Sequence, residues 1–195
     1  MGARQRAALP FILALAVGAS FGCAKTPQQR VKQDAEVIQR EMTPERLQAR
    51  GEAAAMAGDL TRAEQYFVAA MRAGGDPRLL TTRLLVVCVT DSRYPAAASY
   101  GEDYLASHPK DTEIRYAVST VFIGLGELTR ARDWLRRVVE ERPDLAEAHY
   151  ALASVLRDTG ESLLDADQQF REYIRLSPNG AYAEAARASL LKSVP

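Results

Sequence analysis

The sequence predicts an all-α protein, organised as a solenoid of about four helix–turn–helix repeats followed by a C-terminal solvating helix. Residues 58–63, GDLTRA, return at residues 126–131 as GELTRA, with five of six residues identical and a shift of 68, twice 34. Alanines recur at steps of 34, 34 and 35 residues, at Ala63, Ala97, Ala131 and Ala166, and prolines at steps of 34 and 35, at Pro109, Pro143 and Pro178; a one-residue insertion after Gly160 accounts for both steps of 35. A period of 34 residues is typical of helical hairpins that bury their apolar faces against their neighbours. Almost nothing alternates with period two, so strands are not expected.

Residues 1–22 have the pattern of a signal peptide and are expected to lie outside the fold. Two arginines near the start precede an apolar run at residues 7–21, which is too short to cross a bilayer comfortably as a helix. A small residue then precedes Cys23, which resembles a bacterial lipoprotein cleavage site, although Ser20 stands where that site usually has an aliphatic residue. The resemblance implies that Cys23 is the lipidated residue, carrying palmitate. Ordinary cleavage near Ala24 and an uncleaved anchor are the alternatives.

Residues 23–42 are polar and charged and are expected to form a lipid-anchored stalk. Two or more acyl chains hold a protein stably on a membrane, whereas one chain holds it only marginally. Ala24, rather than an aspartate, follows Cys23, and the resemblance to lipoproteins then implies export to the outer membrane, facing the periplasm. The other cysteine, Cys88, stands in an apolar helical stretch and is expected to be a buried thiol.

The repeat domain is expected at residues 43–195. Its units are predicted at residues 44–77, 78–111, 112–145 and 146–180, with a last helix at residues 181–192. Thr43 is placed to cap the first helix, with Pro44 at its first position. Asp144 and Glu147 have the spacing of a capping box at the start of the fourth unit.

The second unit departs from the pattern of the others. Ser92 stands where the turn glycine is expected, and Gly101 stands where a late aromatic residue is expected. Pro95 would begin the second helix of this unit. We therefore expect a helix pair here too, with the loosest packing of the four.

The units resemble tetratricopeptide repeats. That family prefers small residues where its two helices cross, an aromatic residue late in the second helix and a proline at the end of the unit. The matching residues include Gly51, Ala63, Phe67 and Pro77 in the first unit and Ala153, Ala166, Phe170 and Pro178 in the fourth.

The resemblance implies that a partner binds on the concave surface, which the first helix of each unit lines. Register then nominates Gln48, Glu52 and Met56, Thr82, Val86 and Val89, Tyr116, Thr120 and Ile123, and Tyr150, Ser154 and Arg157. This surface is moderately apolar and suits a helix or an extended peptide. Relatives that grip the C-terminal carboxylate of chaperones use lysine and asparagine, whereas this chain has Gln48 and Glu52 at the corresponding places, which argues against that specific role.

The leading functional interpretation is a lipid-anchored adaptor, which docks a peptide or helix of another envelope protein and helps to assemble or stabilise an envelope machine. Tetratricopeptide lipoproteins of this size resemble factors of pilus, motility, secretion and outer-membrane assembly systems. Two alternatives stay open. One is a self-associating structural lipoprotein, and the other is an accessory scaffold for cell-wall enzymes.

Nothing in the sequence points to catalysis, a cofactor, a metal ion or nucleic acid. The chain has two histidines and a formal net charge of zero, without a clustered basic face. His108 precedes a proline at a helix end, and His149 takes a bulky packing position. Carboxylates gather near one turn, at Asp158, Glu161, Asp165 and Asp167, where solvation is the expected role and a cation site the alternative.

The convex side offers a second candidate surface. Arg132 and Arg136 could form a patch for an anionic partner, with Trp134 as an aromatic anchor. The plainer interpretation is a solvated helix face, on which Arg136 pairs with Glu140 and Arg137 with Glu141.

Overall fold

The computed structural model describes residues 28, 31–32 and 42–191. The chain divides into two compact units, residues 1–38 and 39–195, and every helix named below belongs to the second. Cys23, the predicted signal peptide and nearly all of the predicted stalk lie outside the described residues, so their roles stay predictions. No helix in the described part of the chain has the length and apolar character needed to cross a bilayer.

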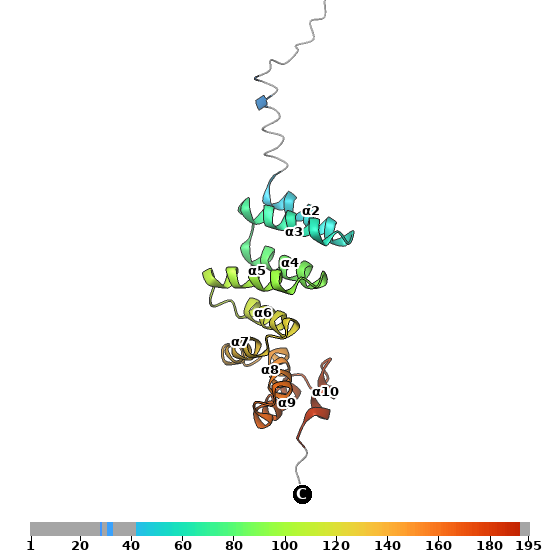
Figure 1. The fold of residues 1–195 in the computed structure, drawn as a ribbon, viewed down its shortest axis with the longest axis vertical. Coiled ribbons are helices and arrows are strands. Elements are labelled where there is room, and N and C mark those ends of the chain that lie inside the picture. Colours follow the sequence, from blue (N-terminus) through green and yellow to red (C-terminus); the bar gives the residue numbers. More distant parts are fainter. Residues whose placement is uncertain (1–27, 29–30, 33–41, 192–195) are drawn as a thin grey trace, which may run out of the picture. The chain divides into compact units, whose positions relative to one another are not determined.

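The described part of the second unit is all-helical. Its helices are α2 (Pro44–Met56), α3 (Leu60–Arg72), α4 (Pro77–Thr90), α5 (Tyr94–Ser107), α6 (Thr112–Leu125), α7 (Leu128–Glu141), α8 (Ala146–Thr159), α9 (Leu163–Leu176) and α10 (Ala183–Ser189). Four consecutive pairs follow one another along this unit, and α10 comes last (Figure 1). We call α2, α4, α6 and α8 the A helices, and α3, α5, α7 and α9 the B helices. This arrangement confirms the predicted solenoid of four helix–turn–helix repeats.

Each A helix passes to its B helix through a residue in the left-handed backbone region. Gly58, Gly126 and Gly160 have φ of 80°, 75° and 66°. Ser92 takes the same place in the second unit, with φ of 58°. Left-handed backbone costs a non-glycine residue energy because its Cβ crowds the following carbonyl. Ser92 is therefore the turn residue that the register predicts, at a position that favours glycine.

Small and large residues complement each other where the helices of a pair cross. A Cβ added to Gly51 of α2 would lie 2.5 Å from Cε1 of Phe67 in α3. The second unit reverses the sizes, because Leu85 of α4 faces Gly101 of α5, where a Cβ would lie 3.5 Å from Cδ2 of Leu85. The same Cβ would lie only 2.1 Å from Cγ2 of Val118, in the next unit. The space that a late aromatic would fill is thus occupied by two aliphatic side chains, and the loose packing expected here is not found at Gly101.

Side-chain caps start several of the helices. Thr43 Oγ1 accepts a hydrogen bond from Arg46 N at 3.4 Å, and Pro44 occupies the first turn, as predicted. The capping box predicted for α8 is wrong. Leu145 is the N-cap residue of that helix and makes no side-chain cap, while the Asp144 carboxylate accepts hydrogen bonds from Arg142 instead.

The last helix is shorter than predicted. Residues 181–192 were expected to be helical, whereas α10 spans only seven residues and ends before Leu190, whose backbone is extended. The Leu191 N–H donates to Asp167 Oδ1 of α9 at 2.7 Å. This bond fixes the chain after α10 in a non-helical path.

Candidate functional site

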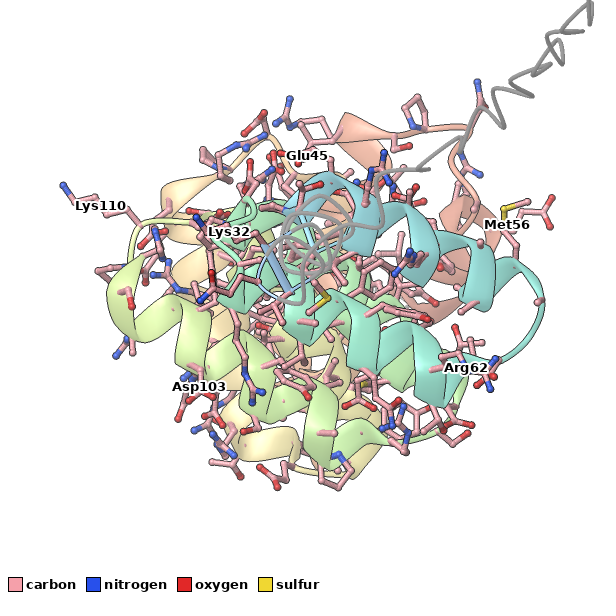
Figure 2. The ribbon with its side chains drawn as sticks, turned by 90° about the horizontal axis from the view of Figure 1, so that it is seen from above. Lys32, Glu45, Met56, Arg62, Asp103 and Lys110 are labelled. Atoms are coloured by element: carbon pink, nitrogen blue, oxygen red, sulfur yellow. The ribbon has the colours of Figure 1, made fainter. Side chains whose placement is uncertain are left out.

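The A helices carry the row of side chains that the register nominates for partner binding. Along this row α4 contacts α6, and α6 contacts α8. Aliphatic side chains are unusually exposed in the first two units: Met56 is 90 % exposed, Val86 57 % and Val89 37 %. Figure 2 shows Met56 at the rim of the molecule, pointing away from the helices. Tyr116 and Ile123 of α6 are half-buried.

The threonine hydroxyls of this row donate to the backbone of their own helices. Thr82 Oγ1 donates to the carbonyl of Arg78 at 2.9 Å, and Thr120 Oγ1 donates to the carbonyl of Ala117 at 2.7 Å. A hydroxyl that donates to its own helix has no proton left to donate to a partner, although its oxygen can still accept one. Val86, Val89 and Ile123 add apolar side chains to this row on α4 and α6, and we call the row formed by Thr82, Val86, Val89, Thr120 and Ile123 the open groove.

The charged residue nominated in the first unit is already paired. Glu52 accepts a hydrogen bond from Gln48 Nε2 at 3.2 Å, and its Oε1 lies 3.1 Å from Arg83 Nη2 of α4. The Arg83 guanidinium is therefore held by an internal carboxylate. A clamp for a free peptide carboxylate would need uncompensated donors, so the geometry fits an apolar ligand better than an anionic chain end.

Two nominated residues of the fourth unit, Tyr150 and Arg157, contact the C-terminal segment, residues 180–191. The Tyr150 ring stacks on the Tyr182 ring, with centroids 4.4 Å apart and planes at 13°. Arg157 Nη1 donates to Ser189 Oγ of α10 at 3.0 Å. The sequence analysis missed Tyr182, although an aromatic residue at the start of the last predicted helix is a signal that could have found it.

Tyr116 of α6 is the nominated tyrosine of the third unit. Burial raises the pKa of its phenol to about 12, and the charges of Glu147 and Tyr182 add to the rise. Tyr116 therefore stays protonated at any physiological pH, as a neutral aromatic side chain between the open groove and the C-terminal segment.

The convex candidate surface is not free. The Trp134 ring is half-buried and meets Phe122 edge-on, with centroids 5.1 Å apart. Arg132 pairs with Glu161 of the next unit, and Arg136 Nη2 lies 3.3 Å from Glu161 Oε1. The Trp134 side chain thus packs against the core, and the charges of both arginines are met by a carboxylate.

The pairs predicted within α7 are also not formed as expected. Arg136 pairs with Glu161 rather than with Glu140. Glu141 pairs with Arg115 of α6, and the charge of Arg137 only helps to lower the pKa of Glu141. Contacts between successive units, which the spacing along one helix does not reveal, hold these side chains.

The remaining chemistry-bearing residues have structural roles. His149 is buried, with Nδ1 2.6 Å from Gln169 Oε1 of α9, as its predicted packing position requires. Cys88 is fully buried, and burial raises the pKa of its thiol to about 11. In the predicted carboxylate cluster, Glu161 pairs with Arg132 and Asp167 pairs with Arg171. Within the described residues, no cluster of potential metal ligands occurs.

The loop between α5 and α6 lines an open cavity of about 680 Å³. Its charged walls compensate one another, because Arg78 pairs with Asp111 and Glu113, and Arg142 lies 3.8 Å from Glu113. We assign it no ligand.

Comparison with known proteins agrees with this fold. A tetratricopeptide repeat model matches residues 89–155. The structure of YrrB, described as a TPR protein with an unusual peptide-binding site, is similar with a TM-score of 0.64 and 19% identity, covering 82% of this chain and 88% of that one. A tetratricopeptide repeat protein from Parabacteroides merdae gives a TM-score of 0.67 and 23% identity over 75% of this chain and 58% of that one.

MamA from Desulfovibrio magneticus gives a TM-score of 0.63 and 20% identity, covering 73% of this chain and 80% of that one. No curated protein matches the sequence. At these identities the similarities show the fold alone. The chain therefore has the tetratricopeptide repeat fold, an architecture whose stacked helix pairs create concave surfaces suited to protein–protein interaction.

Proposed function

We propose that the protein is a lipid-anchored adaptor of the bacterial envelope, and that its open groove binds an apolar helix or extended segment of another protein. The observation that carries the binding proposal is the open groove itself. Val86 and Val89 are exposed on α4, and the hydroxyl of Thr120 on α6, the next A helix, donates to its own backbone. Exposed apolar patches are a feature of protein interaction sites.

An apolar groove suits a partner that buries aliphatic side chains. An amphipathic helix would lay its apolar face on α4 and α6, in the manner of helix-in-groove recognition. YrrB, which has the same fold, is described as having a peptide-binding site, and this description supports binding in a groove here by analogy.

The location rests on the N-terminal sequence. The positive n-region, the apolar run and Cys23 support lipid anchoring, and the absence of aspartate after Cys23 supports the outer membrane, facing the periplasm. A tethered adaptor in this position would help to assemble or stabilise an envelope machine, such as a pilus, motility, secretion or outer-membrane assembly system.

The test compares capture of envelope proteins by two double variants of the full chain. Val86→Lys with Thr120→Lys places two cations on the open groove at exposed positions, so the fold should be unchanged. Ser99→Lys with Gln168→Lys places the same charge on exposed positions of B helices. We expect proteins captured by wild type to be lost with the first variant and retained with the second.

Equal capture by both variants would contradict binding in the open groove. Sedimentation at increasing protein concentration separates the alternative in which a second copy is the occupant. A mass that doubles with concentration in wild type, but not in the groove variant, would identify the groove as a self-association site.

A further inference from the structure

A second cavity lies between α3 and α5, the B helices of the first two units, where α4 contacts both of them. Its volume is about 410 Å³, and its apolar walls come from Val68 and Met71 of α3, Pro77 of α4, and Tyr100 and Tyr104 of α5. Ligand sites are typically concave, with volumes of about 300 to 1,000 Å³, and are lined mainly by apolar and aromatic side chains with a few polar groups. The cavity has this character, and no residue of the open groove lines it.

The least exposed residue of the lining is polar. Thr81 of α4 is 1 % exposed, and its hydroxyl makes no hydrogen bond to another residue in the described part of the chain. The hydroxyl of Thr82 beside it, in contrast, donates to its own helix. A buried hydroxyl without a partner costs free energy, because it has given up its hydrogen bonds to water. Thr81 therefore offers an unused hydrogen-bonding group to a ligand that enters the cavity.

The third and fourth units have a longer polar side chain at this place. Thr81, Arg115 and His149 follow one another at steps of 34 residues. Arg115 donates to the carbonyl of Pro109, and His149 Nε2 lies 3.0 Å from the carbonyl oxygen of Pro143. Both side chains are buried and reach the loop before their own helix. The threonine is too short to do the same, so this space is left open in the second unit.

The cavity between α5 and α7 shows the effect of the longer side chain. It is the counterpart one repeat further on, it is lined by Arg115, and its volume is only about 280 Å³. Arg115 pairs there with Glu141 of α7, whereas Ser107 stands at the corresponding position of α5. The second unit therefore lacks both the arginine and its carboxylate, and the larger cavity follows from their absence.

The aromatic walls of the cavity present ring surface rather than free hydroxyl groups. The hydroxyl of Tyr100 donates to Glu64 at 2.8 Å, and that of Tyr104 donates to Asp111 at 3.0 Å. Aromatic rings attract one another in edge-to-face and offset arrangements, and a methionine sulfur such as that of Met71 adds favourable contacts with a ring. The cavity therefore suits an aromatic group.

Two charges of opposite sign lie at the edge of the cavity. Arg72 of α3 and Asp103 of α5 both line it and are exposed, and neither has an ion-pair partner among the described residues. A peptide that crosses the opening can meet these charges with an acidic and a basic residue, whereas a small neutral molecule would leave both unused. Charge complementarity thus favours a polypeptide as the occupant.

We propose that this cavity is a second binding site, which takes a tyrosine side chain of a partner polypeptide. The ring would pack against Met71 and the two tyrosines of α5, and its hydroxyl would form a hydrogen bond with Thr81. Charged neighbours of that tyrosine would pair with Arg72 and Asp103. The site lies apart from the open groove, so it does not depend on binding there.

Two methionine methyl groups provide a probe and its control. Met71 lines the cavity, whereas Met56 is 90 % exposed on an A helix. Full-length protein with isotope-labelled methionine methyl groups is titrated with a blocked tripeptide of glutamate, tyrosine and lysine, made in both orders. We expect NMR to show a saturable shift of the Met71 methyl signal with at least one order, and none of the Met56 signal. The same peptide with phenylalanine should bind about fivefold more weakly, which is the contribution of one neutral hydrogen bond.

Two variants separate the role of the cavity from that of the hydroxyl. Thr81→Arg with Ser107→Glu copies the pair of Arg115 and Glu141 into the second unit, so it should fill the cavity within an intact fold and abolish the Met71 response. Thr81→Val replaces the hydroxyl by a methyl group of similar size, so the tyrosine and phenylalanine peptides should bind it alike. Circular dichroism and the melting temperature check that both variants are folded.

Absence of a Met71 response in wild type would overturn the proposal, as would an undiminished response in the folded double variant. If the double variant does not fold, Thr81→Val decides, because equal binding of the two peptides by wild type and by this variant also rejects the site. Free p-cresol, which carries the tyrosine side chain alone, is the last arm. If it binds as tightly as the better peptide, a small phenol rather than a polypeptide is the occupant, and the proposal fails.

Discussion

Val118 of α6 fills the place of the side chain that Gly101 of α5 lacks. A Cβ on Gly101 would lie 2.1 Å from Cγ2 of Val118, closer than any real contact of this kind. Val118 is itself fully buried, so it has little room to retreat. The junction between the second and third units therefore depends on the absence of a side chain at Gly101.

Gly101→Ala should consequently destabilise the protein by roughly 1–3 kcal/mol, because overpacking forces neighbouring side chains or backbone to shift. Chemical denaturation measures the loss. Ser99→Ala, at an exposed position of the same helix, is the matched control and should change little. Shortening Val118 to alanine in the Gly101→Ala background should recover part of the loss, and additive costs in that pair would show that the two residues do not interact.

Ser92→Gly should stabilise the protein by about 0.5 to 1 kcal/mol. The gain comes from relieving left-handed backbone at φ of 58°, less the greater freedom of glycine in the unfolded chain. Gly126→Ser, at the equivalent turn of the third unit, is the reciprocal variant and should cost a similar amount. Opposite shifts in melting temperature are expected, whereas shifts of the same sign would contradict the equivalence of the turns.

Alkaline pH should destabilise the fold through the junction of the first two units. Burial raises the pKa of Cys88 from 9.0 to about 11, and burial with the hydrogen bond to Glu64 raises that of Tyr100 from 10.0 to about 12. The neutral forms are thus favoured in the folded state. Their contribution is complete below about pH 9 and is lost as the pH rises through 11 to 12.

Urea unfolding between pH 8 and 11 measures this loss. A shift of two pKa units on Cys88 corresponds to about 2 to 3 kcal/mol at most. Cys88→Ala should flatten the decline between pH 9 and 11, since it removes the titrating thiol. An equally steep decline in that variant would assign the pH dependence to other groups.

Lipid anchoring predicts a change in location. Cys23→Ala should abolish incorporation of labelled palmitate and release the protein from membranes, because the variant lacks the acylated side chain. Cys88→Ala is the control and should keep both, since that thiol is buried in the fold. Labelling that persists in the Cys23 variant would reject the lipoprotein assignment.

The fold could be predicted from the sequence because the repeat makes the same local choices several times. Ala63 and Ala131 are fully buried where they were expected, and Ser92 takes the left-handed turn that its register demands. The filling of the space beside Gly101 by the Val118 side chain could not be predicted, because Val118 belongs to the following unit. Register within one unit does not contain such contacts.

The candidate site was less accessible from the sequence. The exposed aliphatic positions on α4 follow from helix periodicity, and their exposure depends little on distant residues. The stacking of Tyr182 on Tyr150 depends on the path of the chain after α9. The Tyr173 hydroxyl and the Asp167 carboxylate hold this path by accepting hydrogen bonds from the N–H groups of Tyr182 and Leu191. The partners of Arg132 and Arg136 likewise come from another unit, so the predicted pairs within α7 were wrong.

Site-specific photocrosslinking in intact cells tests the central claim most directly. A photoreactive amino acid is placed at Thr120 in the open groove or at Ser99 on a B helix, both exposed positions, in the full-length chain. The account predicts a discrete crosslinked envelope protein from position 120, lost when Val86→Lys is added, and no such product from position 99. A crosslink from position 99 alone, unaffected by Val86→Lys, would contradict binding in the groove and place the partner on the other helices.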